Sequence, residues 1–126
     1  MTLTRPMTYS KLVANDNLKF GDVVLVRFPF TNQLMTKQRP ALVVSGPTYN
    51  FRRPDVIVMA ITSQMANAAE YAHAEILDWA AAGLLKASVL KPVVATIEQS
   101  LVVKCLGALS YSDMSKVERV LEVIRE

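Results

Sequence analysis

Short runs of β-branched and aliphatic residues, separated by turn-forming residues, constrain the fold of this chain more than any other feature. Runs of this length and composition predict β-strands. We expect strands at residues 23–28, 40–45, 55–61, 88–90, 93–97 and 101–109. Pro29 should end the first strand, and Ser45-Gly46-Pro47 should form a turn after the second. The chain is therefore predicted to be mainly β.

The C-terminal segment has the pattern of an amphipathic helix. Four apolar residues recur there at helical spacing, namely Val117, Val120, Leu121 and Ile124. Ser110 lies three residues before Asp113, as in a capping box, so its hydroxyl should accept a hydrogen bond from an unpaired N–H. The Asp113 carboxylate should favour the positive end of the helix. Short strands closed by one helix predict a small, strongly bent sheet or barrel.

The middle of the chain is ambiguous. Residues 65–85 are rich in Ala and Glu and could form a helix on propensity alone. Residues 71–77 also alternate as a strand would, and the break at Ala82-Gly83-Leu84 favours short pieces over one long helix.

Length and composition indicate one packed domain. The chain has 126 residues, of which 52% are hydrophobic and 20% charged. We expect a flexible arm at residues 1–16 and a single domain at residues 17–126. No apolar segment approaches the roughly 20 residues of a membrane-spanning helix, and the start lacks the apolar stretch of an export signal. The expected location is the cytoplasm, without membrane contact.

Cysteine and histidine usage limits the metal and redox chemistry. The chain has one Cys and one His, which cannot form a Cys/His zinc site by themselves. Cys105 lies inside the apolar run 101–109, so we expect a core thiol. We predict neither a metal nor another cofactor.

Positive charge is concentrated in one part of the chain. The net charge is only +3, but no acid occurs between Asp22 and Asp55. The cations inside that interval are Arg27, Lys37, Arg39, Arg52 and Arg53. A polyanion is the natural ligand of the positive surface that they predict.

Two strand ends carry the main functional indication. Arg39 precedes Pro40 at the start of one predicted strand, and another predicted strand runs into Thr62-Ser63-Gln64. If the two strands are neighbours, a guanidinium faces hydroxyls and an amide. Such a set can grip a phosphodiester, because the guanidinium offers several donors and stays charged at neutral pH.

Four segments of the chain form a recognisable series. They are Gly21-Asp22-Val23-Val24, Arg39-Pro40-Ala41-Leu42-Val43-Val44, Ala60-Ile61-Thr62-Ser63-Gln64 and Gly107-Ala108-Leu109-Ser110. Together they resemble the MazF/PemK family of toxin endoribonucleases. Each segment is a weak signal, and their common order and spacing make the match specific. The resemblance implies an SH3-like barrel, a homodimer and a cognate antitoxin. It also implies metal-independent, sequence-selective cleavage of single-stranded RNA at short motifs, in which a ribose 2′-hydroxyl attacks its own phosphate and leaves a cyclic phosphate and a 5′-hydroxyl end.

The resemblance also implies roles for individual residues. Arg39 matches the catalytic arginine of the family, and Thr62 matches its catalytic threonine. The candidate substrate-binding residues are Lys37, Gln38, Ser63, Gln64, Arg52 and Arg53. Because arginine is a poor base at neutral pH, its role should be mainly electrostatic. His73 is a second candidate for the base, because its ordinary pKa lies in the physiological range, or else a structural or surface residue. It matches no residue of the family.

Two other functions stay open on the sequence. The same barrel can serve as a binding module without cleavage, directed at nucleic acid or protein, and related toxins poison DNA gyrase. Alternatively, the chain is an interaction protein whose basic face meets an acidic partner. An acidic, disordered antitoxin tail would suit that face as well, and should compete with RNA for it.

Overall fold

The computed structural model describes residues 18–27 and 37–126. Its strands are β1 (Asp22–Arg27), β2 (Gln38–Val43), β3 (Asp55–Thr62), β4 (Ala74–Ile76), β5 (Ser88–Glu98) and β6 (Val102–Ala108). Its helices are α2 (Pro47–Arg52) and α3 (Tyr111–Arg125), with 3₁₀ turns at Met65–Ala69 and Gln99–Leu101. The predicted arm at residues 1–16 and the strand end at Phe28 and Pro29 lie outside the described residues.

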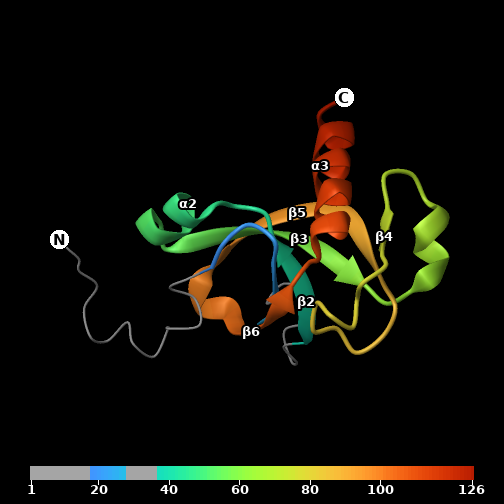
Figure 1. The fold of residues 1–126 in the computed structure, drawn as a ribbon. Coiled ribbons are helices and arrows are strands. Elements are labelled where there is room, and N and C mark those ends of the chain that lie inside the picture. Colours follow the sequence, from blue (N-terminus) through green and yellow to red (C-terminus); the bar gives the residue numbers. More distant parts are fainter. Residues whose placement is uncertain (1–17, 28–36) are drawn as a thin grey trace.

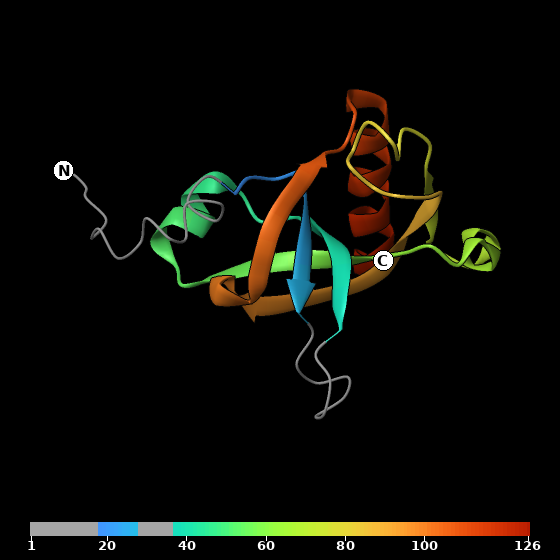
Figure 2. The same ribbon diagram turned by 90° about the horizontal axis from the view of Figure 1, so that it is seen from below.

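The strands form one antiparallel sheet in the order β4-β5-β3-β2-β1-β6. The sheet curls into a half-barrel, and α3 stands against one side of it (Figure 1). Seen from below, β6 runs beside β1 and the segment after β4 lies next to α3 (Figure 2). The predicted mainly β fold with a C-terminal helix is confirmed. No helix in the described residues is both long and apolar enough to cross a membrane.

Both faces of the sheet are buried, which explains the unbroken apolar runs in the sequence. Successive strand residues point to opposite faces. Accordingly, Val23 packs in a cluster with Val117 and Val120 of α3, and the next residue, Val24, packs in a second cluster with Val56 of β3. The second cluster is enclosed by β1, β2 and β3 with the adjoining ends of β5 and β6. The central strands are thus fixed from two sides.

The two strands predicted at residues 88–90 and 93–97 are one strand, β5. The prediction of a break at Lys91-Pro92 is wrong. The β3–β5 register shifts between Met59 and Ile61, where Lys91 and Pro92 pass their partner strand. Proline is tolerated at such an irregularity because the missing N–H leaves no ladder hydrogen bond unmade.

The ambiguous middle segment forms short pieces and no long helix. Met65–Ala69 is a 3₁₀ turn, and β4 lies within the strand-like stretch 71–77. Turns follow as far as residue 83. The buried side chains of Ala82 and Leu84 pack in the same cluster as those of Val117 and Val120 of α3.

Helix α2 was not predicted, since Ser45-Gly46-Pro47 was interpreted only as a turn. Pro47 occupies the first turn of the helix, where its missing N–H does no harm. The helix is attached to the sheet by buried Asn50, whose amide donates to the Leu18 carbonyl at 2.9 Å, and by the side chain of Gln99, which donates to the Asn50 carbonyl at 2.7 Å. These contacts join segments that are far apart in the chain.

The prediction that Cys105 is a core thiol is wrong, because its side chain is exposed. Among the strands of the described residues, β6 lies at the edge of the sheet and pairs only with β1. An apolar run in an edge strand need not be enclosed on both faces, and Val103 of the same strand is also exposed. Trp79, by contrast, packs against the core.

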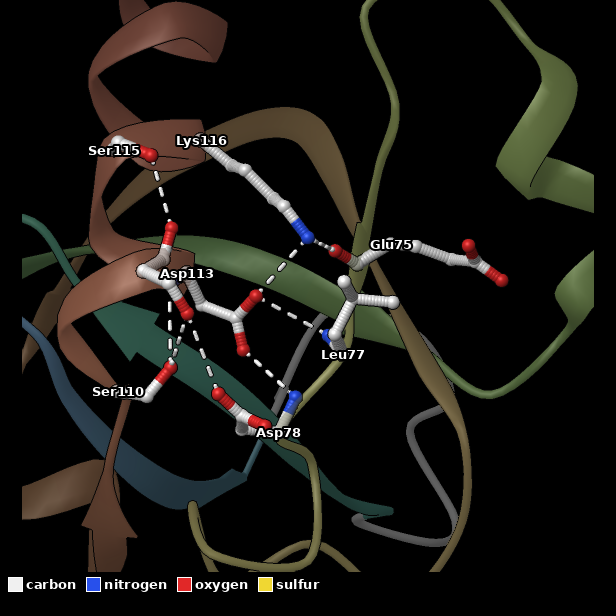
Figure 3. A network of polar contacts seen from close by, with 8 residues as sticks. Glu75, Leu77, Asp78, Ser110, Asp113, Ser115 and Lys116 are labelled. Carbon is white, nitrogen blue, oxygen red and sulfur yellow. Dashed lines mark hydrogen bonds and ion pairs between the residues drawn. The ribbon is translucent and has the colours of Figure 1, made fainter.

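Asp113 attaches the segment after β4 to α3 (Figure 3). The Ser110 hydroxyl accepts a hydrogen bond from the Asp113 N–H at 3.2 Å, which confirms the predicted cap. The fully buried Asp113 carboxylate does not return to Ser110. It accepts hydrogen bonds from the backbone N–H groups of Leu77 at 3.2 Å and Asp78 at 2.9 Å, and from Lys116 at 3.0 Å.

The same segment is held against β6 by two glycines. Gly83 has a φ of +89°, and a Cβ atom built on it would lie 2.2 Å from the Leu106 carbonyl oxygen. A Cβ atom on Gly107 would lie 2.5 Å from the Ala82 carbonyl oxygen. Only residues without side chains allow the two backbones to approach this closely. The turns before β5 are therefore fixed on one side by α3 and on the other by β6.

We predict that Gly83→Ala lowers the free energy of unfolding by at least about 2 kcal/mol, because the new methyl group adopts an unfavourable φ and collides with the backbone of β6. Gly46→Ala is the matched control. Gly46 has a negative φ and no atom within 4 Å of an added Cβ, so the change should stay within about 0.5 kcal/mol. Urea denaturation of both variants measures the difference, and equal effects would contradict the close approach.

A second prediction concerns pH. Burial raises the pKa of Asp113, but the hydrogen bonds from the Asp78 amide, Lys116 and the Leu77 amide together bring it below its usual value. A lowered folded-state pKa stabilises the protein above the ordinary carboxyl pKa of about 3.9, and this stabilisation is lost as the pH falls through the folded-state pKa.

Asp113→Asn should therefore lower the free energy of unfolding by about 1 to 3 kcal/mol at pH 7, and by less as the pH drops below about 4. Denaturant titrations across this range measure the difference. Glu118→Gln removes an exposed carboxylate of the same helix and serves as the control. A deficit of Asp113→Asn that stayed constant with pH would argue against the role assigned to its charge.

Candidate functional site

The pairing of β2 with β3 brings the two predicted strand ends together. The strands are antiparallel neighbours, and their register sets Ala41 opposite Ala60. Continued by two residues on each strand, this register sets Arg39 opposite Thr62. Directly opposed residues have Cβ atoms about 5 Å apart and share one face of a sheet. The convergence expected from the sequence is thus a consequence of strand register.

Both residues line one cavity of about 390 Å³, called here the Arg39 cavity. Ser63 and Gln64, which follow Thr62 in the chain, line it too. Leu25 and Pro40, paired between β1 and β2, also line it. So do residues 83–86, the stretch that Gly83 fixes against β6. The cavity is thus bounded by a curled sheet and by a segment anchored at several points.

The Thr62 hydroxyl is oriented by its own backbone. Its Oγ1 accepts a hydrogen bond from the Gln64 N–H at 3.1 Å. Because that bond uses a lone pair of the oxygen, the hydroxyl hydrogen stays available for an acceptor in the cavity. Thr62 is half-buried, whereas Arg39, Ser63 and Gln64 are exposed. The opening of the cavity thus carries the Arg39 guanidinium, the Thr62 hydroxyl and the Gln64 amide.

The described lining of the Arg39 cavity contains cations and no acid. The cations are Arg39, Lys86 and Lys104, which come from β2, from the segment before β5 and from β6. None of the three forms an ion pair within residues 18–27 and 37–126. The described residues also contain no group of three His, Cys, Asp or Glu side chains that could hold a metal ion. An anion is the complementary ligand of this cavity.

Lys37 and Gln38 lie next to the cavity in the chain but do not line it. Gln38 is the first residue of β2 and pairs with Arg27 of β1, and Lys37 directly precedes it. Both side chains are exposed. Their predicted contact with substrate stays a prediction.

Arg52 and Arg53 are remote from the Arg39 cavity. They lie at the end of α2, and α2 and the end of β3 are at opposite ends of the molecule (Figures 1 and 2). Arg53 donates two hydrogen bonds of 3.0 Å to Asp55 and stacks over the Tyr49 ring at 5.5 Å. Hydrogen bonding in this pair raises the pKa of Arg53 and lowers that of Asp55. Arg53 thus has a partner within the chain.

His73 lines a different cavity, of about 510 Å³, between residues 71–74 and α3. Its Nδ1 donates to the Tyr71 carbonyl at 3.0 Å, since a carbonyl can only accept. Its buried Nε2 has no hydrogen-bond partner among the described residues and lies 3.8 Å from the Glu70 carboxylate. Because His73 is absent from the Arg39 cavity, its position gives no support to its role as the alternative base.

Lys86 and Lys104 were missed as site residues. Lys86 belongs to the segment whose structure was ambiguous, so nothing related it to Arg39. Lys104 interrupts the apolar run 101–109, and a cation within such a run was a signal that could have been used. Both residues reach the cavity only through the placement of β6 and of the segment that packs on it.

Solved structures share this fold. A mycobacterial endoribonuclease in complex with its cognate antitoxin aligns with a TM-score of 0.64 and 17% identity, covering 85% of this chain and 91% of its own. MazE–MazF from Deinococcus radiodurans aligns with a TM-score of 0.68 and 22% identity, covering 86% and 95%. The Mycobacterium tuberculosis toxin MazF-mt6 aligns with a TM-score of 0.65 and 19% identity, covering 81% and 93%.

Sequence comparison assigns the family. No curated protein matches the chain. A family model described as the PemK-like, MazF-like toxin of type II toxin-antitoxin systems matches residues 19–124, which include all the described strands and nearly all of α3. The chain therefore belongs to the family of PemK-like, MazF-like toxins of type II toxin-antitoxin systems.

Proposed function

We propose that this toxin is an endoribonuclease that cleaves single-stranded RNA in the Arg39 cavity. The observation that carries the proposal is the convergence of Arg39 and Thr62, from adjacent strands, on a cavity whose described lining has three cations and no acid. Similar solved structures are named endoribonucleases, which supports the same activity on this fold. Since RNA is the substrate, the protein is expected to act in the cytoplasm.

The proposed reaction is a transesterification within the RNA. The ribose 2′-oxygen attacks the adjacent phosphorus, the bond from phosphorus to the 5′-oxygen breaks, and a cyclic phosphate and a 5′-hydroxyl end result. The proton of the 2′-hydroxyl passes to solvent, and the leaving 5′-oxygen takes a proton from solvent. The nucleophile belongs to the substrate, so the reaction needs no metal to generate it.

Arg39 and Thr62 would act on the charge that develops at phosphorus. The Arg39 guanidinium neutralises the non-bridging oxygens, and such a preorganised donor typically contributes about 100- to 1,000-fold in rate. The Thr62 hydroxyl donates to a phosphate oxygen, since its own oxygen is oriented by the Gln64 N–H. Ser63 and Gln64 supply further donors at the same opening.

The size of the cavity supports a single-stranded substrate. About 390 Å³ lies near the lower end of the roughly 300 to 1,000 Å³ typical of ligand sites. A double helix cannot enter such a space, whereas an unpaired nucleotide with its phosphate can. The 2′-hydroxyl that the chemistry requires also restricts the substrate to RNA.

We further propose a cognate acidic antitoxin and a homodimer. Antitoxin complexes among the similar structures support the first, as does the positive charge of the cavity. The apolar strands from residue 93 to 109 suit either the core or a dimer interface. Val93, Val94 and Val103 in that stretch are exposed, with Val93 at 51%, and offer apolar surface to a second copy.

Mapping of RNA ends tests the activity. Purified wild-type protein should cut single-stranded RNA and leave cyclic phosphate and 5′-hydroxyl ends. Arg39→Ala should reduce the cleavage rate about 100- to 1,000-fold, because it removes the charge at the transition state. Thr62→Ala should also slow cleavage while Thr62→Ser retains the hydroxyl and most of the rate. Binding without such ends, across varied sequences, would favour the non-cleaving module instead.

Competition tests the antitoxin proposal. A saturating acidic antitoxin peptide should displace labelled single-stranded RNA, since both ligands require the cations of the Arg39 cavity. The displacement is followed by fluorescence anisotropy, with a peptide of the same composition and scrambled order as the control. Simultaneous binding of peptide and RNA would refute the overlap of the two sites.

A further inference from the structure

Lys86 and Lys104 have no task in the mechanism above, although both line the Arg39 cavity. The reaction uses one cation, Arg39, at the phosphate that is cleaved. The two lysines come from other elements, so their presence beside Arg39 is not a by-product of one strand's sequence. The question is which anionic group they face.

Electrostatics favours an anionic ligand at both lysines. Like charges that converge without an opposing charge repel one another, and this repulsion falls when an anion enters. Three cations elsewhere in the described residues are paired with acids, Lys19 with Asp22, Arg53 with Asp55 and Lys116 with Asp113. Other cations, such as Arg119 and Arg125 of α3, have no ion pair there either, but the Arg39 cavity is where three of them line one space without an acid.

The sheet register places Lys104 two strands away from the part of β2 that carries Arg39. Leu25 of β1 pairs with Pro40 of β2 on one side and with Lys104 of β6 on the other. Pro40, Leu25 and Lys104 form a row across three strands, and all three line the cavity. Two strand spacings separate the backbone of Lys104 from that of Pro40, the residue next to Arg39, by about 10 Å, which is more than a single phosphate group spans. Lys104 is thus suited to a different phosphate from the one beside Arg39.

The backbone of Lys86 is fixed. Its carbonyl accepts a hydrogen bond of 2.8 Å from the hydroxyl of Ser88, a buried residue at the start of β5. Three residues earlier, Gly83 makes the close approach to Leu106 of β6. Lys86 therefore has a backbone that is held in place and a flexible side chain that ends in a compact positive charge.

We infer that Lys86 and Lys104 bind the phosphate next to the one held by Arg39, so that the cavity takes two consecutive phosphates of a single strand. This inference rests on the proposed function and extends it to the substrate on one side of the cleaved bond. It assigns Lys86 and Lys104 to binding, and leaves the chemical step to Arg39 and Thr62.

The first test measures the salt dependence of binding. The probe is a fluorescein-labelled pool of random-sequence single-stranded RNA with 2′-O-methyl groups, which cannot be cleaved by 2′-hydroxyl attack. For single strands, each phosphate contact contributes about 0.7 to the slope of log affinity against log salt. The double variant Lys86→Gln/Lys104→Gln loses one such contact and should therefore reduce the affinity loss between about 50 and 200 mM salt by about 2.6-fold, with each single variant giving part of this effect.

Arg125→Gln is the matched control for net charge. Arg125 is the last residue of α3, and it does not line the Arg39 cavity. Its variant should keep the wild-type slope. Wild-type slopes for both lysine variants, or an equal reduction by Arg125→Gln, would overturn the inference.

The second test locates the contacted phosphate. In an RNA that the wild type cleaves, one phosphate next to the cleaved bond is replaced by a neutral methylphosphonate, first on the 5′ side and then on the 3′ side. With one of the two substrates, wild type and the lysine variants should have equal KM values, because the contact is already lost. A lysine effect that persists with both substrates would contradict the inference.

The outcomes separate the two proposals. If the wild type cleaves RNA and the lysine variants bind and cleave as it does, the subsite is refuted and the endoribonuclease proposal stands. If the wild type leaves every RNA intact while the lysine variants still lower the salt slope, the cleavage proposal fails and the phosphate contacts stand. A wild type that neither binds nor cleaves refutes both.

Discussion

The antiparallel register between β2 and β3 is the constraint on which the rest of the site depends. It sets Ala41 opposite Ala60, and the same register continued by two residues on both strands brings Arg39 toward Thr62, with which it lines one cavity. A shift of one residue would turn either side chain to the other face of the sheet. The register is fixed because both faces are buried, so that Leu42 and Val43 on β2 must each meet their own cluster. Core packing therefore aligns the functional groups.

Charge distribution distinguishes the candidate site from the rest of the molecule. The longest acid-free interval of the sequence lies between Asp22 and Asp55, but its cations are distributed to different places. Arg53 is neutralised by Asp55 at the end of α2, whereas Arg39 joins Lys86 and Lys104 around a cavity without acids in its described lining. Unpaired positive charge that several elements bring together is the property a polyanion-binding site requires. The acid-free interval predicted an anionic ligand, but of its cations only Arg39 is among the residues that line the cavity.

The accuracy of the sequence-based predictions varied with the range of the interactions involved. The Ser110 cap was predictable because a helix start depends on residues three apart. The break in β5 was wrongly predicted, because an irregularity in its pairing with β3 accommodates Pro92. The exposure of Cys105 was missed since it depends on β6 lying at an edge of the sheet. Lys86 and Lys104 were missed for a similar reason, as only packing between distant segments brings them to Arg39.

The sequence by itself determined the mainly β fold with a C-terminal helix, the family, and Arg39 and Thr62 as the leading candidates. These follow from local apolar periodicity and from motifs carried on single segments. Only the tertiary structure decided which cations share a cavity, and which are already paired. Strand order, register and the close approach of Gly83 to β6 set those distances, and they arise from contacts between residues that are remote in the chain.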